Sequence, residues 1–192
     1  YEQYYNEFYY CSNDTIGELA GQAFLAAMEK KGMPIDTGII GVNMNVENEA
    51  LNHRIQAFRD YIAANAPALK MTETYYNNNV VENSQTNAEN IISSYGKELI
   101  GMYSGNNITA DGVCNAVRGA GLGEKFVSVG VDSDDIEIKA LRDGFLDAIV
   151  VQNAYEQGYK CMENAIRTVV TGANPETEKQ INCPPVIVTT DN

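Results

Sequence analysis

The sequence lacks tryptophan altogether and contains a single histidine, His53. None of its four cysteines belongs to a CxxC pair or to a Cys/His metal-binding spacing, so no structural zinc site or other metal site is expected. A His-based catalytic triad has one candidate base at most, and no Ser or Cys stands in an elbow motif such as GxSxG. Because no nucleophile, base and orienting group can be assembled, the sequence predicts a protein that is not an enzyme and uses no cofactor.

Positive charge and long apolar runs are also scarce. The chain has 13 Lys and Arg against 26 Asp and Glu, a net charge of −13, and such a surface repels phosphate backbones and anionic lipid headgroups. The longest apolar runs fall far short of the roughly 20 residues that cross a bilayer. We therefore expect no direct nucleic-acid binding and no membrane insertion, and a neutral or cationic small molecule is the expected ligand.

The opening stretch YEQYYNEFYY has no initiator Met, and no basic start precedes an apolar segment. This stretch resembles a β-strand that has been cut from the part of the chain before it. The sequence therefore predicts a mature or truncated product that carries no signal peptide.

The four cysteines lie far apart along the chain. Cys114 and Cys161 stand at the spacing of helical core positions, where a small buried thiol is common. For Cys11 and Cys183, a disulfide and two free thiols are both open at the level of sequence.

Hydrophobic periodicity predicts a regular alternation of strands and helices. Helices are expected over residues 14–31, within 47–67, and over 81–95, 108–121, 134–143 and 153–171. Strands are expected over residues 37–44, 69–76, 98–104, 126–131, 145–152 and 185–190. This order predicts an α/β fold, a three-layer α/β/α lobe with a mainly parallel sheet and helices on both faces.

Two apparent motifs have simpler explanations. The stretch RGAGLGEK (118–125) follows a helix and leads into a strand, whereas a phosphate-binding loop follows a strand and opens a helix, so we interpret it as a helix C-cap and turn. The aspartates 132, 134 and 135 suggest a magnesium pocket, but the middle strands offer no acceptor aspartate. We expect Asp132 to face a ligand site while Ser133 or Asp134 caps the next helix.

Polar side chains recur at the ends of the predicted strands and at the starts of the neighbouring helices. Ligands of parallel α/β sheets bind beyond the carboxyl ends of the strands. The candidates at these positions are Asn13, Arg54, Asn106, Asp132 and Gln152. Each alone is explained as a cap or a surface residue, but together they supply a guanidinium, a carboxylate and amides, which pair with vicinal hydroxyls.

Five segments, in this order, carry a family resemblance: SNDTIGELAG (12–21), HRIQAF (53–58), MYSGNNITADGVCNAVRGAG (102–121), VSVGVDSDDIEIKALRDG (127–144) and VVQNAYEQGYKCMENAI (150–166). With these segments the chain resembles the type I periplasmic binding proteins. These are ribose- and galactose-type sugar receptors whose fold is shared with the effector domains of LacI-type repressors.

The resemblance implies ligand-binding roles for six residues. The family's arginine, amide, carboxylate and glutamine ligands of a sugar correspond to Arg54, Asn106, Asp132 and Gln152. Asn13 stands where many relatives have Asp. Tyr76, or its neighbour Tyr75, lies in a loop where relatives often place an aromatic ring that stacks on a sugar face.

The resemblance also implies a division of the chain. Family members have two lobes and three crossovers between them, so residues 12–150 correspond to the C-terminal lobe, completed by a return strand at 184–190. Residues 1–11 then form the remnant of a crossover strand, and most of the N-terminal lobe is missing. Residues 151–172 correspond to a helix that packs on the N-terminal lobe in relatives.

That last helix carries an apolar stripe, formed by Tyr155, Tyr159, Met162, Ala165, Ile166 and Val169. Burying such a stripe is worth several kcal/mol at about 25 cal/mol per Å². We expect helix 153–171 to be covered by the N-terminal lobe, by a second copy of the chain or through domain swapping.

The function implied by the resemblance is that of a solute receptor. Such a protein binds a sugar or related polyol outside the cytoplasm and delivers it to an ABC-type permease. The alternative is a ligand-sensing effector domain of a LacI-type repressor or of a membrane sensor, because these domains bind the same ligands.

Overall fold

The computed structural model describes residues 5–174 and 178–192. The strands are β1 (Phe8–Tyr10), β2 (Ile39–Met44), β3 (Lys70–Tyr76), β4 (Leu99–Ser104), β5 (Val127–Val131), β6 (Ala148–Val151), β7 (Gln180–Asn182) and β8 (Val186–Val188). The helices are α1 (Asn13–Lys30), α2 (Glu49–Asn65), α3 (Val81–Tyr95), α4 (Asn107–Gly119), α5 (Asp135–Arg142) and α6 (Ala154–Thr171), with a 3-10 turn at Gly96–Glu98. Residues 1–4 of the predicted strand remnant lie outside the described residues.

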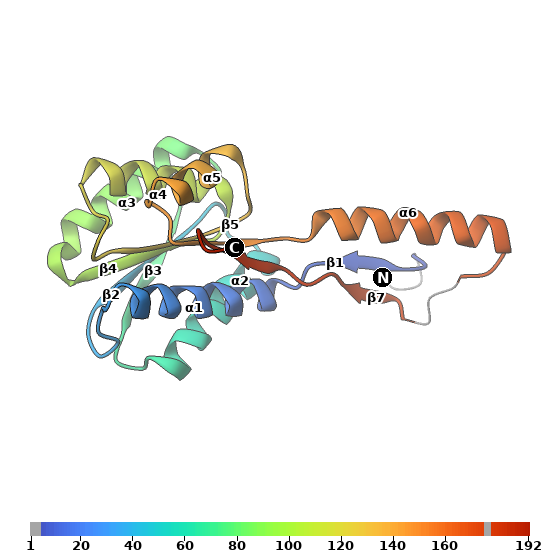
Figure 1. The fold of residues 1–192 in the computed structure, drawn as a ribbon, viewed down its shortest axis with the longest axis horizontal. Helices are drawn as coiled ribbons and strands as arrows, with labels where there is room; N and C mark the ends of the chain where they lie inside the picture. The colour runs from blue at the N-terminus through green and yellow to red at the C-terminus, as the bar shows by residue number, and fades with distance from the viewer. Residues whose placement is uncertain (1–4, 175–177) are drawn as a thin grey trace.

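The main sheet has the strand order β3-β2-β4-β5-β6-β8. All neighbours pair in parallel except β6 and β8, which are antiparallel. Helices α1 and α2 cover one face, and α3, α4 and α5 cover the other, as Figure 1 shows. The predicted α/β class, three-layer architecture and mainly parallel sheet are confirmed. Because both faces are covered, strands such as β5 are buried along their whole length.

The predicted strand 145–152 is shorter in the structure, where β6 begins at Ala148. Leu146 turns into the core, and Asp147 uses its carboxylate in polar contacts rather than a place in the ladder. Strand β7 was not predicted, because its three residues carry too little hydrophobic alternation to be distinguished from a loop.

Close packing of α1 on α2 fixes the position of the start of both helices. A side chain at Gly17 would place its Cβ 2.1 Å from the carbonyl oxygen of Arg54, so only glycine permits this approach. Below this contact the ring of Phe58 stacks on Tyr103 of β4 with centroids 4.2 Å apart, and Phe24 meets Phe58 edge to face. The helix pair is therefore held at a defined height above the sheet.

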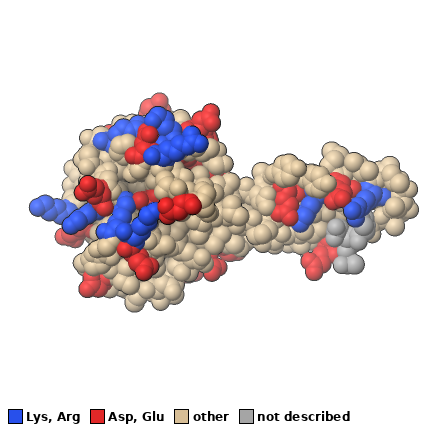
Figure 2. Space-filling view, in the orientation of Figure 1, with Lys and Arg blue, Asp and Glu red and all other residues tan. Residues whose placement is uncertain are grey.

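Strands β1 and β7 form a separate two-stranded parallel sheet. Together with α6 this sheet makes an arm that projects from the lobe (Figure 1). Helix α6 contacts β1, where the amide of Asn164 donates to the hydroxyl of Tyr9 at 3.1 Å. Figure 2 shows acidic and basic side chains as neighbours along the arm, and the ion pairs Glu156–Lys160 and Glu163–Arg167 account for them on α6.

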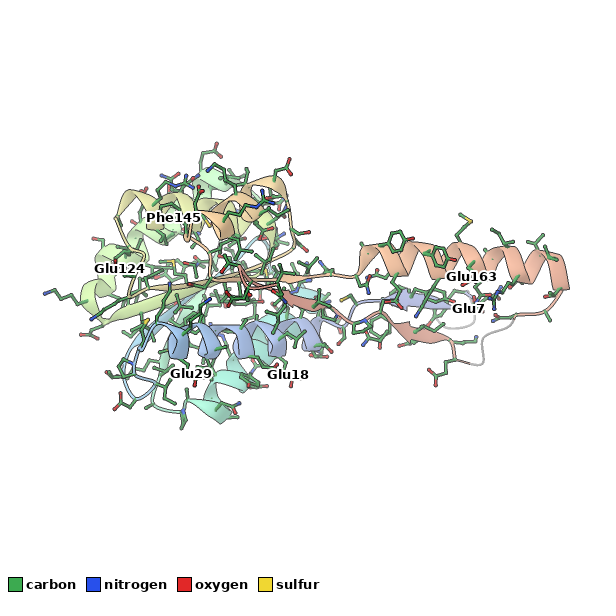
Figure 3. The ribbon with its side chains drawn as sticks, in the orientation of Figure 1. Glu7, Glu18, Glu29, Glu124, Phe145 and Glu163 are labelled. Atoms are coloured by element: carbon green, nitrogen blue, oxygen red, sulfur yellow. The ribbon has the colours of Figure 1, made fainter. Side chains whose placement is uncertain are left out.

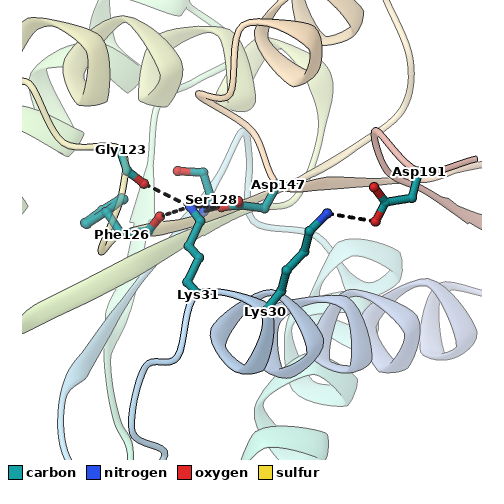
Figure 4. Close-up of polar contacts among 7 residues, drawn as sticks. All are labelled: Lys30, Lys31, Gly123, Phe126, Ser128, Asp147 and Asp191. Atoms are coloured by element: carbon teal, nitrogen blue, oxygen red, sulfur yellow. Dashed lines mark hydrogen bonds and ion pairs between the residues drawn. The ribbon is translucent and has the colours of Figure 1, made fainter.

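One lysine anchors the end of α1 to the sheet (Figure 4). The Nζ of Lys31 donates to the carbonyl oxygens of Gly123 and Phe126 at 2.9 and 2.6 Å and lies 2.7 Å from the carboxylate of Asp147. The same carboxylate accepts from the backbone N–H of Ser128 at 3.0 Å. Both side chains of the pair are largely buried, 18% and 17% exposed, so each depends on the other for compensation of its charge.

We expect Lys31→Met to lower the free energy of unfolding by about 3 kcal/mol, because it leaves the carboxylate of Asp147 buried without its cation. The neighbouring Lys30 provides a matched control, since its pair with Asp191 is 62% and 70% exposed. Lys30→Met is expected to change stability by less than about 1 kcal/mol. Urea unfolding followed by circular dichroism measures both changes, and equal effects of the two substitutions would contradict the assignment.

A buried carboxyl group lies beneath the start of α5. Asp134 and Glu137 form a capping box, and the Oε2 of Glu137 accepts from the backbone N–H of Asp134 at 3.3 Å. The other oxygen has no partner among the described residues and would lie 2.8 Å from a Cβ at Gly130. Burial, reinforced by the carboxylates of Asp134, Asp132 and Asp111, raises the pKa of Glu137 to about 9. The group is therefore protonated at neutral pH.

This carboxyl group makes stability depend on pH. Between its ordinary pKa of 4.5 and its raised value of about 9, the folded chain holds a proton that the unfolded chain releases. Its contribution is therefore complete below about pH 4.5 and is lost as the pH rises, by at most about 1.4 kcal/mol per pH unit.

We expect Glu137→Gln to remove this part of the decline, because glutamine resembles the protonated acid and does not titrate. Urea unfolding at pH 5, 7 and 9 measures the slope. Asp135→Asn in the same helical turn is the control, since Asp135 is exposed and should leave the decline unchanged. Parallel pH curves for the unsubstituted chain and Glu137→Gln would show that another group is responsible.

Candidate ligand-binding site

The parallel strands β4, β5 and β6 bring their carboxyl ends to one edge of the sheet. The residues that follow these strands are Asn106, Asp132 and Gln152. The start of α1 adds Asn13, and the first half of α2 adds Arg54. The structure thereby brings five of the six residues predicted from the sequence to this edge. Arg54 contacts Asn13 and Gly105, and Asp132 contacts Asn107 and Gln152. The backbone of residues 105–107, which includes Asn106, joins the two sets of contacts.

Arg54 is the buried cation of this edge, with 5% of its surface exposed. Its Nε donates to the Oδ1 of Asn13 at 2.9 Å, and its Nη1 donates to the carbonyl oxygen of Gly105 at 2.6 Å. Both acceptors are neutral oxygens. The positive charge is therefore held in place without being neutralised by them, and these contacts use two of the five N–H groups of the guanidinium.

Asp132 supplies the negative charge. Its Oδ1 accepts from the amide of Gln152 at 2.6 Å, and its Oδ2 accepts from the backbone N–H of Asn107 at 3.4 Å. Its backbone has φ of +91°, a conformation that side-chain-bearing residues seldom adopt and that costs about 1–3 kcal/mol. The surrounding contacts hold this conformation, so the carboxylate has a fixed direction.

Asn106 also has a structural role as a helix cap, which the sequence could not distinguish from ligand binding. As the N-cap of α4 it accepts from the backbone N–H of Thr109 at 3.3 Å and from the Thr109 hydroxyl. Its side-chain oxygen is thus committed to the helix, while its amide nitrogen lies 3.5 Å from the Oδ1 of Asn107. The amide hydrogens are the part of Asn106 that is suited to a ligand.

Three features of this edge were not predicted. The carbonyl of Gly105 and the backbone N–H of Asn107 orient the two charged side chains, and backbone groups carry no sequence signal. The hydroxyl of Tyr103 is buried and has no hydrogen-bond partner among the described residues. Burial is the main cause that raises the pKa of Tyr103. The charge of Arg54 lowers this pKa and that of Asp132 raises it, so the phenol lies within electrostatic reach of both charges. The polar pair Tyr103 and Ser104, which ends the otherwise apolar strand β4, was the available signal.

Tyr76 lies apart from these polar contacts. At the end of β3 it packs against the core that α1 and α2 cover. Burial and the carboxylate of Glu47 raise its pKa, and the neighbouring Arg59 lowers it. Its predicted stacking on a sugar stays a prediction.

Within residues 5–174 and 178–192, no group of three or more His, Cys, Asp or Glu side chains is placed to hold a metal ion. In the same part of the chain, no helix has the length and apolar character of a membrane span. A groove of about 580 Å³ lies between α1 and the segment around β8, and none of the six predicted residues lines it.

Comparison with known proteins identifies relatives. A family model described as periplasmic binding protein domain matches residues 6–173. Among curated proteins, the D-apiose import binding protein of Paraburkholderia graminis is 28% identical over 179 residues, which make up 90% of this chain and 53% of that protein. The chain thus spans about half the length of this relative.

Solved structures give the same result. An ABC transporter solute-binding protein from Agrobacterium vitis with bound D-fucose matches 100% of this chain and 62% of its own chain, with a TM-score of 0.83 and 30% identity. A carbohydrate transporter solute-binding protein from Agrobacterium radiobacter, in complex with D-arabinose, matches 98% of this chain and 62% of its own, with a TM-score of 0.86 and 25% identity. The chain belongs to the type I periplasmic binding protein family of sugar-binding proteins, which are solute-binding proteins and not enzymes.

Proposed function

We propose that this chain is the C-terminal lobe of a receptor for a sugar or a related polyol. The complete receptor lies outside the cytoplasm and delivers this ligand to an ABC-type permease. One observation carries the proposal: an oriented carboxylate and an oriented guanidinium flank residues 105–107 at the edge of the sheet. The names of the relatives, which include transporter and import binding proteins, favour this role over that of a repressor or sensor domain.

The two charged groups are complementary to neighbouring hydroxyls. One sugar hydroxyl donates to the carboxylate of Asp132, and another accepts from the guanidinium of Arg54. Each charge-assisted hydrogen bond contributes roughly 1.5–3 kcal/mol, so three or four of them supply much of the approximately −8 kcal/mol of a micromolar affinity. Since one lobe provides one wall of a cleft, we expect the chain by itself to bind weakly.

In this proposal the lobe comprises residues 12–150 and the return strand 184–190, while residues 1–11 and 151–172 reach toward the N-terminal lobe. Support comes from α6, whose bulky side chains project on the side away from β1 (Figure 3). Tyr155 and Val169 are 81% and 84% exposed. Such a row of exposed apolar residues is typical of a surface that another domain covers.

Asp132→Asn tests the binding site. In the two-lobed protein that contains this chain, we expect the substitution to weaken sugar binding by about 100-fold, since it replaces a charged acceptor of hydroxyl groups by an amide. Asparagine tolerates positive φ, so the backbone at this position is retained. Isothermal titration calorimetry with D-fucose, D-arabinose, D-allose and D-apiose identifies a ligand of the unsubstituted protein and then measures the loss.

The matched control is Asp135→Asn, which removes an exposed carboxylate from the first turn of α5 and should leave the dissociation constant within about twofold, as is usual for surface sites. An unchanged affinity of Asp132→Asn would refute the role of that carboxylate. If the unsubstituted protein binds none of a wider panel of sugars and polyols, the proposed ligand class is wrong.

Ile166→Glu tests the covering of α6. Ile166 is already 56% exposed in this chain, so a glutamate here should leave the melting temperature of the isolated chain nearly unchanged. In the two-lobed protein the same glutamate is buried, and we expect the melting temperature to fall by several degrees. Glu163→Gln, on the charged side of the same helix, is the control.

Equal effects of Ile166→Glu in the two proteins would contradict contact between α6 and the N-terminal lobe. Sedimentation of the isolated chain adds a second readout. A dimer that Ile166→Glu dissociates would show that a second copy covers the stripe instead.

A further inference from the structure

Two cysteines lie where the chain passes between the arm and the lobe. Cys11 separates β1 from α1, and Cys183 directly follows β7. The parallel register of these strands places Tyr10 opposite Asn182, and the backbone N–H of Cys183 donates to the carbonyl oxygen of Tyr10 at 2.7 Å. The next pair in this register is Cys11 and Cys183.

The geometry of a parallel pair suits a covalent link. Opposite residues on adjacent parallel strands direct their side chains to the same face, and the strands lie about 4.8 Å apart. This spacing falls within the Cα separations of roughly 4.4–6.8 Å found for disulfides. The two thiols also influence one another: burial raises the pKa of Cys11, and the nearby Cys183 raises it further.

The other two cysteines have different surroundings. Cys114 is buried among α4, α5 and β6, and burial raises its pKa to about 12. Cys161 is exposed on α6, so the burial expected for it from the sequence was wrong. Cys11 and Cys183 are therefore distinguished from them by being neighbours across a strand pair, although all four are free thiols in this structure.

We propose that Cys11 and Cys183 are a disulfide-forming pair that links the first and third connections between lobe and arm. The bond forms by thiol–disulfide exchange with a low-molecular-weight disulfide. The thiolate of one cysteine attacks a sulfur of the reagent and releases one thiol, and the second cysteine then displaces the other thiol from the mixed disulfide. Two protein thiols are oxidised by two electrons in total, the reagent is reduced, and the two protons end on the released thiols.

The bond lies where all three connections meet. Besides Cys183, Cys11 lies against the second connection, because the backbone N–H of Asn153 hydrogen-bonds to its sulfur and lowers its pKa. The link closes a loop that contains α1 to α6, and a loop of this length restricts the unfolded chain strongly. Oxidation is therefore expected to stabilise the lobe and to hold together two of the three segments that join the lobe to the arm.

The test uses the folded chain and does not depend on ligand binding, so its outcome is separate from that of the proposed function. The reduced protein is incubated with oxidised glutathione at pH 8.5, because both thiols have raised pKa values, and is then quenched, denatured and alkylated. We expect two alkylated cysteines instead of four, a Cys11–Cys183 cross-linked peptide in a monomeric chain, and a melting temperature higher by several degrees.

Single substitutions make the result specific. Cys11→Ser and Cys183→Ser should each prevent the loss of two alkylatable thiols and the rise in melting temperature, while Cys161→Ser should retain both. The proposal is overturned if the folded chain keeps four alkylatable cysteines, or if oxidation only adds glutathione to single cysteines or joins chains through Cys161. It is also overturned if the bond forms only when the oxidant acts on the chain in denaturant.

Discussion

The arrangement of this lobe depends on the hydrogen bonds that hold the buried guanidinium of Arg54. A charge removed from water costs several kcal/mol unless hydrogen bonds compensate it, and here the oxygens of Asn13 and Gly105 do so. These contacts join α2 to the start of α1 and to the end of β4. The close approach of the two helices at Gly17 is part of the same arrangement, since it brings the backbone of Arg54 against α1. Because both acceptors are neutral, the structure orients a positive charge at the edge of the sheet without neutralising it.

Asp132 complements this cation by a different physical route. Its carboxylate is oriented by one side-chain amide and one backbone N–H, and its backbone is held at positive φ. The strain is maintained by the well-packed strand β5 and by the capping box that begins α5. Beneath that capping box the protonated Glu137 avoids adding a further negative charge to a cluster that already holds Asp132 and Asp134. One end of the lobe thus places the oriented carboxylate of Asp132 near an acid that burial keeps neutral.

The arm has the opposite distribution of polar and apolar groups. Within the lobe, apolar side chains lie between the sheet and the helices on both of its faces, whereas α6 has its apolar row in the open and its ion pairs alongside. Exposed apolar side chains in such a row are typical of a helix face that another protein surface covers. Strands β1 and β7 of the arm end next to the two cysteines, where the chain passes into the lobe, so these cysteines and the exposed helix belong to the same part of the molecule.

The alternation of strands and helices, and with it the parallel sheet, could be predicted from the sequence because hydrophobic periodicity is a local property of the chain. The sequence also predicted Asn106, Asp132 and Gln152 as site residues, since polar residues at strand ends stand out from apolar surroundings, and it added Arg54 of α2. The tertiary structure added the rest: the backbone groups that orient the two charges, the hydroxyl of Tyr103 that has no hydrogen-bond partner among the described residues, the separate position of Tyr76, and strand β7, which brings Cys183 next to Cys11. Each of these depends on contacts between segments far apart in the chain, and the order of residues does not record which backbone groups or buried hydroxyls those contacts pair.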